Sequence, residues 1–412
     1  MKFFKDLVRA GFVTAAAMLV LEAGLRLAGV HYGASLYQPE QERAYSLRPN
    51  AEGWSVDEAD VYIRINSDGM RDRERPISRP PQTLRVAVIG SSEAEARQVP
   101  LEETFKEVMN RDLSRQLEPR GWHADVLNFG VPSFTFSQEY LTLRNHVWKY
   151  TPQVVILLFS ARPVLKTTRA FAESELQGAP VYVLQNGKLV PDAITRNAPP
   201  IHAGRLRWKN RISDWMNRTS LLSLLNEAVV KSRELVEGLR PRPQAPSSSA
   251  PLQLTYREGA GDTWRYNPDQ PEIRESWAIT DAFIKAMKED CDQHGAEFWI
   301  VAADLEMQSH PSLPERAAFQ RRLGLLSLDL VDQHLERLGA ANTIPVVALS
   351  QPLGEYAASH NVFLHGSMTA RDNVGHWNAV GHEVVGHAIA QELLTRSRAV
   401  QSLASGMTLS KR

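Results

Sequence analysis

Short apolar segments alternate with stretches of helical periodicity from residue 84 to residue 396 of this chain. Each segment is too short for a helix and is rich in Val, Ile, Leu and Phe, which is typical of a buried strand. The predicted strands are residues 85–90, 124–130, 154–159, 298–303 and 345–349. The predicted helices are residues 101–117, 137–149, 274–294, 316–338 and 378–396. Because strands that alternate with helices join through right-handed crossovers, the pattern predicts an α/β fold with a mostly parallel five-stranded central sheet.

The alternation stops after Arg162 and resumes near Arg274. A hairpin is predicted over residues 181–190, because an Asn-Gly pair at its centre is a strong signal for a tight turn. We therefore expect residues 163–270 to be an insertion that forms a lid or side wall.

Two further parts of this insertion differ in composition. Residues 203–237 have helical character and carry many basic side chains, and the Pro- and Ser-rich residues 241–251 predict a flexible surface loop. We expect the basic side chains to be solvated, with contact to a membrane surface as the alternative.

The N-terminus has the charge order of an export signal. Three basic residues precede the apolar residues 10–21, and Glu22 and Arg26 interrupt the apolar character before it resumes to Val30. The basic residues are Lys2, Lys5 and Arg9. This order predicts a cytoplasmic N-terminus. Since no small-x-small cleavage site follows the apolar core, we favour an uncleaved anchor over residues 1–30, with residues 10–30 in contact with the membrane. The alternatives are a cleaved signal peptide and an amphipathic helix on the surface of a soluble protein.

Composition argues against several classes of function. The 412 residues carry a formal net charge of zero, which gives no reason to expect a nucleic-acid partner. The single cysteine, Cys291, cannot form an internal disulfide, and no Cys/His spacing predicts a metal or cofactor site. Residues 382–387 read HExxxH, in which the histidines are five apart rather than the four that a zinc protease motif requires.

Three loops are expected at the carboxyl edge of the sheet, where ligands bind in open parallel sheets. They are residues 90–93, 128–133 and 373–378. Ser92, in a strand-to-helix turn, could act as a nucleophile if a base took its proton, and His376 in the last loop could be that base. Ser92 could equally cap a helix, and His376 could simply be an exposed loop residue.

The order of these loops resembles a known family. Residues 88–92 with 99–105 (VPLEETF), residues 126–132 (VLNFGVP) with Gln138, and residues 376–382 (HWNAVGH) resemble the first, second and last sequence blocks of SGNH (GDSL-type) hydrolases. Residues 47–50 and 65–72 resemble the lead-in of membrane-anchored bacterial members. The resemblance covers most of the chain outside the insertion. It implies a three-layer sandwich in flavodoxin-like strand order, on the periplasmic side of a bacterial inner membrane.

The resemblance also implies roles for single residues. Ser92 matches the nucleophile, Gly130 together with the Ser92 N–H matches the oxyanion donors, and His376 matches the base. Three positions depart from the family pattern, and the third of them is the acid before His376. Ser91 stands where an aspartate usually precedes the nucleophile, and residues 159–163 lack the third-block asparagine that donates to the oxyanion.

Possible replacements lie close by in the sequence. Arg162 or Ser160 could donate in place of the missing asparagine. Asn373 stands three residues before His376, where the family has its acid, and a neutral amide cannot replace a carboxylate. We therefore predict that the neighbouring Asp372 is the acid partner of His376; the alternative is that Asp372 caps the turn before the last helix or faces water.

These departures leave two functions open. The first is a serine-dependent hydrolase or transferase acting outside the cytoplasm on O-acyl esters, with an acyl ester or an O-acetylated glycan as substrate. The second is a catalytically inactive SGNH-fold protein that binds a carbohydrate or a protein partner in envelope or polysaccharide assembly. Both share the same expected organisation: an extracytoplasmic connector over residues 31–80, the α/β domain over 81–400 and a tail over 401–412.

Overall fold

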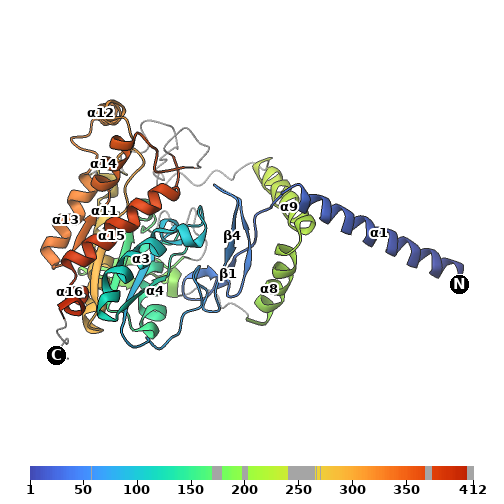
Figure 1. Cartoon of the computed structure of the whole chain (residues 1–412). Helices are drawn as coiled ribbons and strands as arrows, with labels where there is room; N and C mark the ends of the chain where they lie inside the picture. The colour runs from blue at the N-terminus through green and yellow to red at the C-terminus, as the bar shows by residue number, and fades with distance from the viewer. Residues whose placement is uncertain are drawn as a thin grey trace.

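The computed structural model of the chain describes residues 1–56, 58–168, 179–196, 203–239, 265, 267–269, 271–366 and 374–405. The strands are β1 (Tyr37–Glu40), β2 (Ala44–Leu47), β3 (Glu52–Ser55), β4 (Val61–Arg64), β5 (Thr83–Gly90), β6 (His123–Asn128), β7 (Val154–Phe159), β8 (Tyr182–Gln185), β9 (Lys188–Pro191), β10 (Glu297–Ala302) and β11 (Val346–Ala348). The helices are α1 (Lys2–Leu27), α2 (Ser92–Glu95), α3 (Phe105–Leu117), α4 (Phe136–Thr142), α5 (Arg162–Leu165), α7 (Ala193–Arg196), α8 (Ala203–Asn217), α9 (Ser220–Leu239), α11 (Arg274–Gln293), α12 (Leu313–Arg322), α13 (Leu330–Asn342), α14 (Ser350–His360), α15 (Ala379–Arg396) and α16 (Arg398–Ser405). Figure 1 shows α1 projecting from a rounded body that holds the other elements.

The central sheet has five strands in the order β11-β10-β7-β5-β6, and every neighbouring pair is parallel. Counted in chain order within the sheet, this is the flavodoxin-like order 2-1-3-4-5, as expected. Every residue of β7 is buried, because this strand lies at the centre of the sheet and is covered on both faces. The sequence pattern therefore identified the sheet and its central strand correctly.

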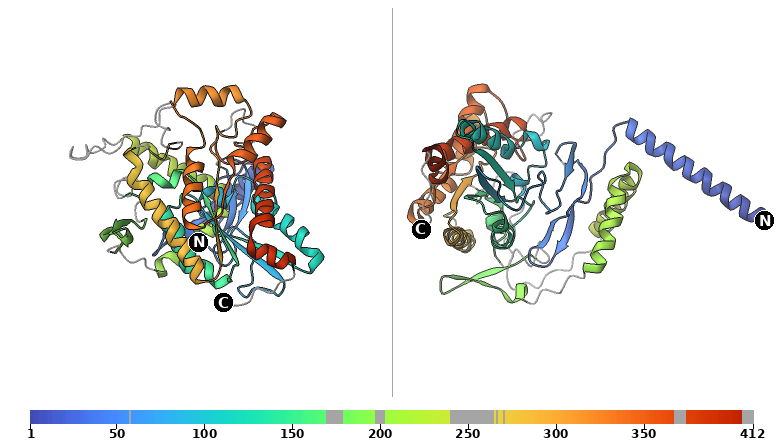
Figure 2. Two further views of the ribbon diagram at one scale, coloured as in Figure 1. Left: turned by 90° about the vertical axis from the view of Figure 1, so that its left-hand side faces the viewer. Right: turned by 60° about the horizontal axis from the view of Figure 1, so that its bottom comes forward.

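Helices cover both faces of this sheet (Figure 2), which confirms the three-layer architecture. On one face, α4, α11 and α13 pack on alternate strand residues such as Ile89 and Leu157. On the other face, α3, α14 and α15 pack on the intervening residues, such as Val88 and Leu158. Helices α3 and α15 approach so closely that a Cβ on Gly386 would lie 2.5 Å from the Val108 side chain. Because successive side chains of a strand point to opposite faces of the sheet, each face has its own apolar cluster.

The segment before the sheet is more ordered than its sequence predicts. Residues 31–80 were expected to form a connector; between residues 37 and 64 this stretch forms two antiparallel hairpins, β1-β2 and β3-β4. Leu36, Ile63 and Phe134 lie in the apolar cluster that joins these hairpins to the loop after β6. Residues 61–66 alternate in the sequence and contain β4, whereas the four-residue strands β1, β2 and β3 are too short for a clear alternating pattern.

Helical segments differ from prediction at two places. The helix expected over residues 316–338 is two helices, α12 and α13, because Gly324 has a φ of +63° and ends the first of them. Helix α14, which follows β11, was not predicted, because its sequence lacks a clear apolar period. The hairpin expected around Asn186-Gly187 is confirmed as β8-β9, whereas residues 241–251 lie outside the described part of the chain.

Candidate active site

Ser92 begins the short helix α2 at the carboxyl end of β5. The turn between them is tight: a Cβ on Gly90 would lie 3.0 Å from the carbonyl oxygen of Leu158 in the neighbouring strand. The first N–H groups of a helix have no acceptor inside that helix. The turn therefore holds both the Ser92 hydroxyl and the Ser92 N–H at the sheet edge, where the sequence predicted them.

The lead-in residues 65–72 hold α2 in place. The buried guanidinium of Arg71 donates to the carbonyls of Glu95 (2.8 Å), Ala96 and Val99, at and just after the end of α2. Asp72 accepts from the N–H of Asn128 at the end of β6 (3.1 Å). This stretch, noted in the sequence only as a resemblance, thus fixes the two strand ends that carry the site.

His376 lies on a loop that a buried ion pair holds. The imidazole of His365 contacts Asp304 Oδ2 through Nε2 and the carbonyl of Gly375 through Nδ1, each at 2.9 Å. The indole of Trp377 donates to the other oxygen of Asp304 at 2.8 Å. Both ring nitrogens of His365 face acceptors, so the ring carries two protons. Burial lowers the pKa of His365, but Asp304 outweighs it and raises the value to about 9.

Three side chains form a continuous hydrogen-bonded chain at the sheet edge. Nε2 of His376 lies 2.8 Å from Oγ of Ser92, and Nδ1 lies 2.6 Å from Oε1 of Glu58. Glu58 also accepts from the backbone N–H of His376 at 3.2 Å. The predicted proximity of Ser92 and His376 is therefore present. The side chains stand in the order serine, histidine, carboxylate, which is the order of groups that a serine hydrolase requires.

The charges in this chain reinforce one another. Burial lowers the pKa of His376, but its hydrogen bond to Glu58 and the charges of Glu93 and Glu58 outweigh burial, so the pKa lies above its usual value. Burial raises the pKa of Glu58, but its bonds to His376 outweigh this effect and the pKa falls below its usual value. A carboxylate in this position fixes the tautomer with Nδ1 protonated and Nε2 free to accept from Ser92.

Glu93 adds a second carboxylate beside Ser92. Its Oε2 accepts from the Ser91 hydroxyl at 2.7 Å and lies 3.3 Å from Ser92 Oγ, while Ser160 Oγ donates to its Oε1 at 3.3 Å. Burial raises the pKa of Glu93, but His376, the Ser91 hydroxyl and Arg162 outweigh it, and the pKa lies below its usual value. The single proton of Ser92 can therefore point either to His376 or to Glu93.

A cavity of about 80 Å³ opens beside these residues. Glu58, Glu93 and His376 line it, as do Ser160 and Arg162, the two candidates for the missing asparagine donor. The positive charge of Arg162 acts on both Glu93 and His376.

The geometry of Gly130 does not match the oxyanion role expected for it. Its N–H donates to the side-chain oxygen of Asn128 at 2.9 Å, so it is already occupied. A Cβ on Gly130 would lie 2.4 Å from the backbone nitrogen of Glu95 and 2.6 Å from the carbonyl carbon of Ala94. Gly130 is therefore required here for close packing of the β6 loop on α2, a need that the sequence block alone could not reveal.

Two predicted residues, Asp372 and Asn373, lie outside the described part of the chain. The carboxylate that contacts Nδ1 of His376 is Glu58, which the sequence analysis missed. Its only signal was the neutral Asn373 at the usual acid position, which indicates that the acid comes from elsewhere. Glu93 was also missed, although it directly follows Ser92 in the sequence.

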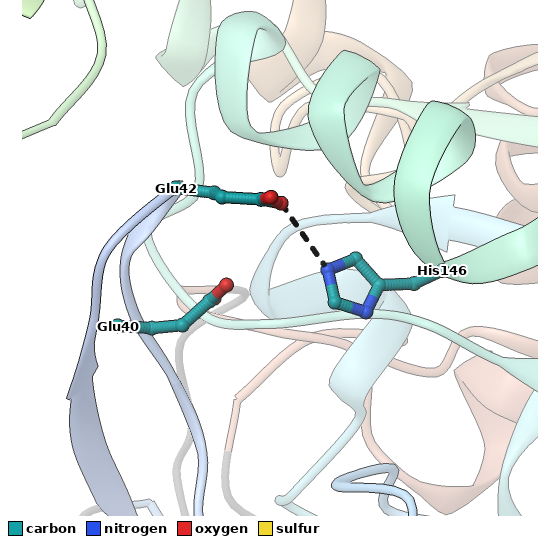
Figure 3. A group of neighbouring side chains, drawn as sticks. All are labelled: Glu40, Glu42 and His146. Carbon is teal, nitrogen blue, oxygen red and sulfur yellow. Dashed lines mark ion pairs between the residues drawn. The ribbon is translucent and has the colours of Figure 1, made fainter. Parts of the chain in front are cut away.

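Among the described residues, one group has ligand atoms close enough together for a metal ion: Glu40, Glu42 and His146 (Figure 3). Glu42 lies 3.9 Å from His146, and Glu40 is already paired with Arg43 at 2.7 Å. Burial and Arg43 lower the pKa of His146 to about 4. The guanidinium of Arg43 therefore already pairs with one carboxylate of this group, and we assign no metal ion to it.

The HExxxH segment does not form a ligand cluster. His382 is buried and accepts from the N–H of Phe105 at 3.3 Å, whereas His387 is exposed and contacts Asp112. The two rings therefore serve different surfaces of α15, as their spacing predicts.

Comparisons with known proteins give structural neighbours only. No protein-family model and no curated protein match the chain. Similar solved structures include the acetyl xylan esterase AlAXEase, at 12% identity and a TM-score of 0.36 over 75% of this chain and 99% of that one. A member of the lipolytic protein G-D-S-L family from Veillonella parvula DSM 2008 has 10% identity and a TM-score of 0.34 over 76% and 98%. A catalytic mutant of Axe2, an acetylxylan esterase from Geobacillus stearothermophilus, has 9% identity and a TM-score of 0.36 over 75% and 93%.

The structural neighbours are thus GDSL-type lipolytic hydrolases and esterases, the family that the sequence blocks resemble. At these identities and TM-scores we base no chemistry on the likeness. The proposed chemistry rests instead on the side chains around Ser92.

Proposed function

We propose that this protein is a serine-dependent acyl-ester hydrolase or acyltransferase with Ser92 as nucleophile, His376 as base and Glu58 as acid. The observation that supports this most is the unbroken chain of contacts, 2.8 Å from Ser92 to His376 and 2.6 Å from His376 to Glu58. A serine and a histidine brought together by chance need no carboxylate behind the ring, whereas a catalytic pair does.

The reaction uses each group in turn. Ser92 Oγ attacks the ester carbonyl carbon while its proton passes to Nε2 of His376. The tetrahedral intermediate then breaks its bond to the leaving oxygen, which takes the proton from His376, and the acyl group remains on Ser92. Water or an acceptor hydroxyl then attacks the acyl-enzyme in the same way, giving hydrolysis or transfer respectively. Glu58 stabilises the imidazolium that forms in both halves.

For the oxyanion we propose the N–H of Ser92 and the guanidinium of Arg162. Arg162 lines the cavity, and its charge reaches both Glu93 and His376. Gly130 could contribute only if Asn128 released its N–H. The substrate we propose is a short acyl ester, such as an O-acetyl group on a glycan, because the cavity is small and polar.

We also propose that α1 anchors the protein with its main domain outside the cytoplasm. Helix α1 contains an 18-residue window with a mean hydropathy of 1.6, and none of the residues in that window is buried. Such a helix is compatible with a membrane anchor or a signal sequence. Its uncharged stretch, residues 10–21, is shorter than the about 20 apolar residues that span a hydrocarbon layer of about 30 Å, so the charged residues on either side would lie near the two interfaces. Reporter fusions after Ala34 test the orientation; activity only in the cytoplasm would contradict it.

A second function is favoured by two observations. The Gly130 N–H is occupied, and the anionic Glu93 lies beside Ser92, where it opposes the negative charge of an oxyanion. Both features suit a protein that binds an acylated glycan or a partner without cleaving it.

Turnover of a short-chain aryl ester by the detergent-solubilised full chain separates the two functions. Hydrolysis that Ser92→Ala abolishes, and that the exposed Ser359→Ala leaves unchanged, supports the enzyme. Absence of Ser92-dependent turnover with any ester or acyl acceptor supports the binding protein.

A further inference from the structure

The two faces of α8 are reversed relative to an ordinary surface helix. Its inward face is polar: Asn210 donates to Gln38 of β1 at 2.8 Å, and Asp214 pairs with the buried guanidinium of Arg48. Asn217, one turn further along, binds backbone groups of the N-terminal segment. A surface helix normally turns its apolar side to the core and its polar side to water. Helix α8 therefore docks on the body through hydrogen bonds.

The outward face of α8 is apolar. Trp208, Ile212 and Trp215 are 71%, 49% and 63% exposed, and their i, i+4, i+7 spacing places them in one stripe. Helix α9, which packs against α8, also exposes Leu225 and Val229, at 53% and 48%. Large contiguous apolar patches on a protein surface mark sites of interaction. We call these five residues the α8–α9 apolar face.

Hydrogen bonds connect this helical pair to the end of α1. Glu22 accepts from the N–H groups of Ser220 and Leu221, at 3.0 and 2.8 Å, and so caps the start of α9. Arg26 donates to the carbonyl of Arg218 at 2.7 Å. In Figure 1 and in the right-hand view of Figure 2, α8 and α9 run across the direction of α1, on the side of the body from which α1 projects. A bilayer crossed by α1 would lie against that side.

We propose that the α8–α9 apolar face rests in the lipid surface at the outer end of α1. Two tryptophans on one stripe suit the headgroup level, where amphipathic rings concentrate. Three exposed basic residues flank the stripe and favour anionic headgroups. They are Arg207, Lys209 and Arg211. The inference rests on the proposed anchoring by α1, but not on the proposed chemistry. Its consequence is that the catalytic body has one fixed orientation to the membrane.

The test measures membrane depth by spin labelling of the full chain in vesicles of phosphatidylcholine and phosphatidylglycerol. The buried Cys291 is replaced by Ala, and one cysteine at a time is placed at Ile212, at Ala16 within α1, or at Leu326. Leu326 is the matched control, because it is an apolar residue 92% exposed on the loop between α12 and α13. Collisions of each nitroxide with oxygen and with a water-soluble nickel chelate report its depth.

We expect the label at Ile212 to collide with oxygen at least several-fold more, relative to nickel, than the label at Leu326. A reading in lipid at Ala16 but in water at Ile212 would overturn this inference and leave the anchor intact. Readings in water at both would overturn the anchor and the inference together. A third outcome is dipolar broadening between labels at Ile212 of different chains, without lipid contact, that disappears when labelled chains are diluted with unlabelled ones. That outcome would overturn the inference and show that the apolar face binds a second copy of the chain.

Discussion

Replacement of Glu58 by Gln tests the acid of the proposed triad. The change keeps the shape of the side chain and removes the charge that lies 2.6 Å from Nδ1 of His376. In a serine protease, the equivalent change of an aspartate to asparagine lowers kcat by about 10⁴ through the wrong His tautomer. The Glu58 side chain is 33% exposed, so solvent screens part of its charge. We therefore expect a loss of roughly 10²–10⁴ in kcat.

The pH dependence of activity gives an independent readout of the same variant. The base must be neutral to accept the Ser92 proton, and Glu58 and Glu93 raise the pKa of His376 above its usual value. The rising limb of kcat/KM in wild type should therefore lie above about pH 6.5, the usual value for histidine. Without the Glu58 charge the pKa of His376 falls, so the limb in Glu58→Gln should move to lower pH.

The assay is hydrolysis of a short-chain aryl ester from pH 5 to pH 9, with folding checked by circular dichroism. The matched control is Asp60→Asn, which removes the same charge from an exposed position two residues away. If Glu58→Gln keeps both the rate and the pH limb of wild type while Ser92→Ala is inactive, the acid assignment is wrong. Asp372→Asn would then be the next variant to assay.

Three other changes test the scaffold around the site. Asp72→Asn leaves the fully buried ammonium of Lys106 without one of its carboxylates and should cost about 3–5 kcal/mol in urea unfolding; a loss below about 1 kcal/mol would contradict the importance of this pair. His365 has its pKa raised to about 9, so its contribution to stability is complete below about pH 6.5 and is lost as pH rises through 9. Asp304→Asn should remove this slope in Tm, and an unchanged slope would refute the assignment. Gly130→Ala should destabilise the fold by about 1–3 kcal/mol and reduce activity, because its Cβ meets backbone atoms at 2.4 Å; a variant with wild-type Tm would show that the loop relaxes freely.

The sheet could be predicted from the sequence because each of its strands is a short, nearly continuous apolar run. Ser92 and His376 could be predicted because each lies in a loop at the carboxyl edge of that sheet. Glu58 could not, because it reaches the site from the loop between β3 and β4, more than 300 residues before His376, and no sequence pattern links the two residues. The polar inward face of α8 was equally hidden, because its partners Gln38 and Arg48 come from the N-terminal hairpins.

The occupied N–H of Gly130 shows a different limit. The sequence block around it resembles that of a family in which this glycine donates to the oxyanion. The structure gives the glycine a packing role against α2 and gives its N–H to Asn128. Residue type alone cannot separate these two roles, because both require a glycine at the same position.

The most direct test of the central claim is covalent labelling of the detergent-solubilised full chain by a fluorophosphonate probe. The proposed triad predicts that wild type is labelled at Ser92, that Ser92→Ala is not, and that His376→Ala and Glu58→Gln are labelled much more slowly. The exposed Ser359→Ala should be labelled like wild type. Absence of labelling at Ser92 in folded wild-type protein would contradict an activated serine and favour the binding function.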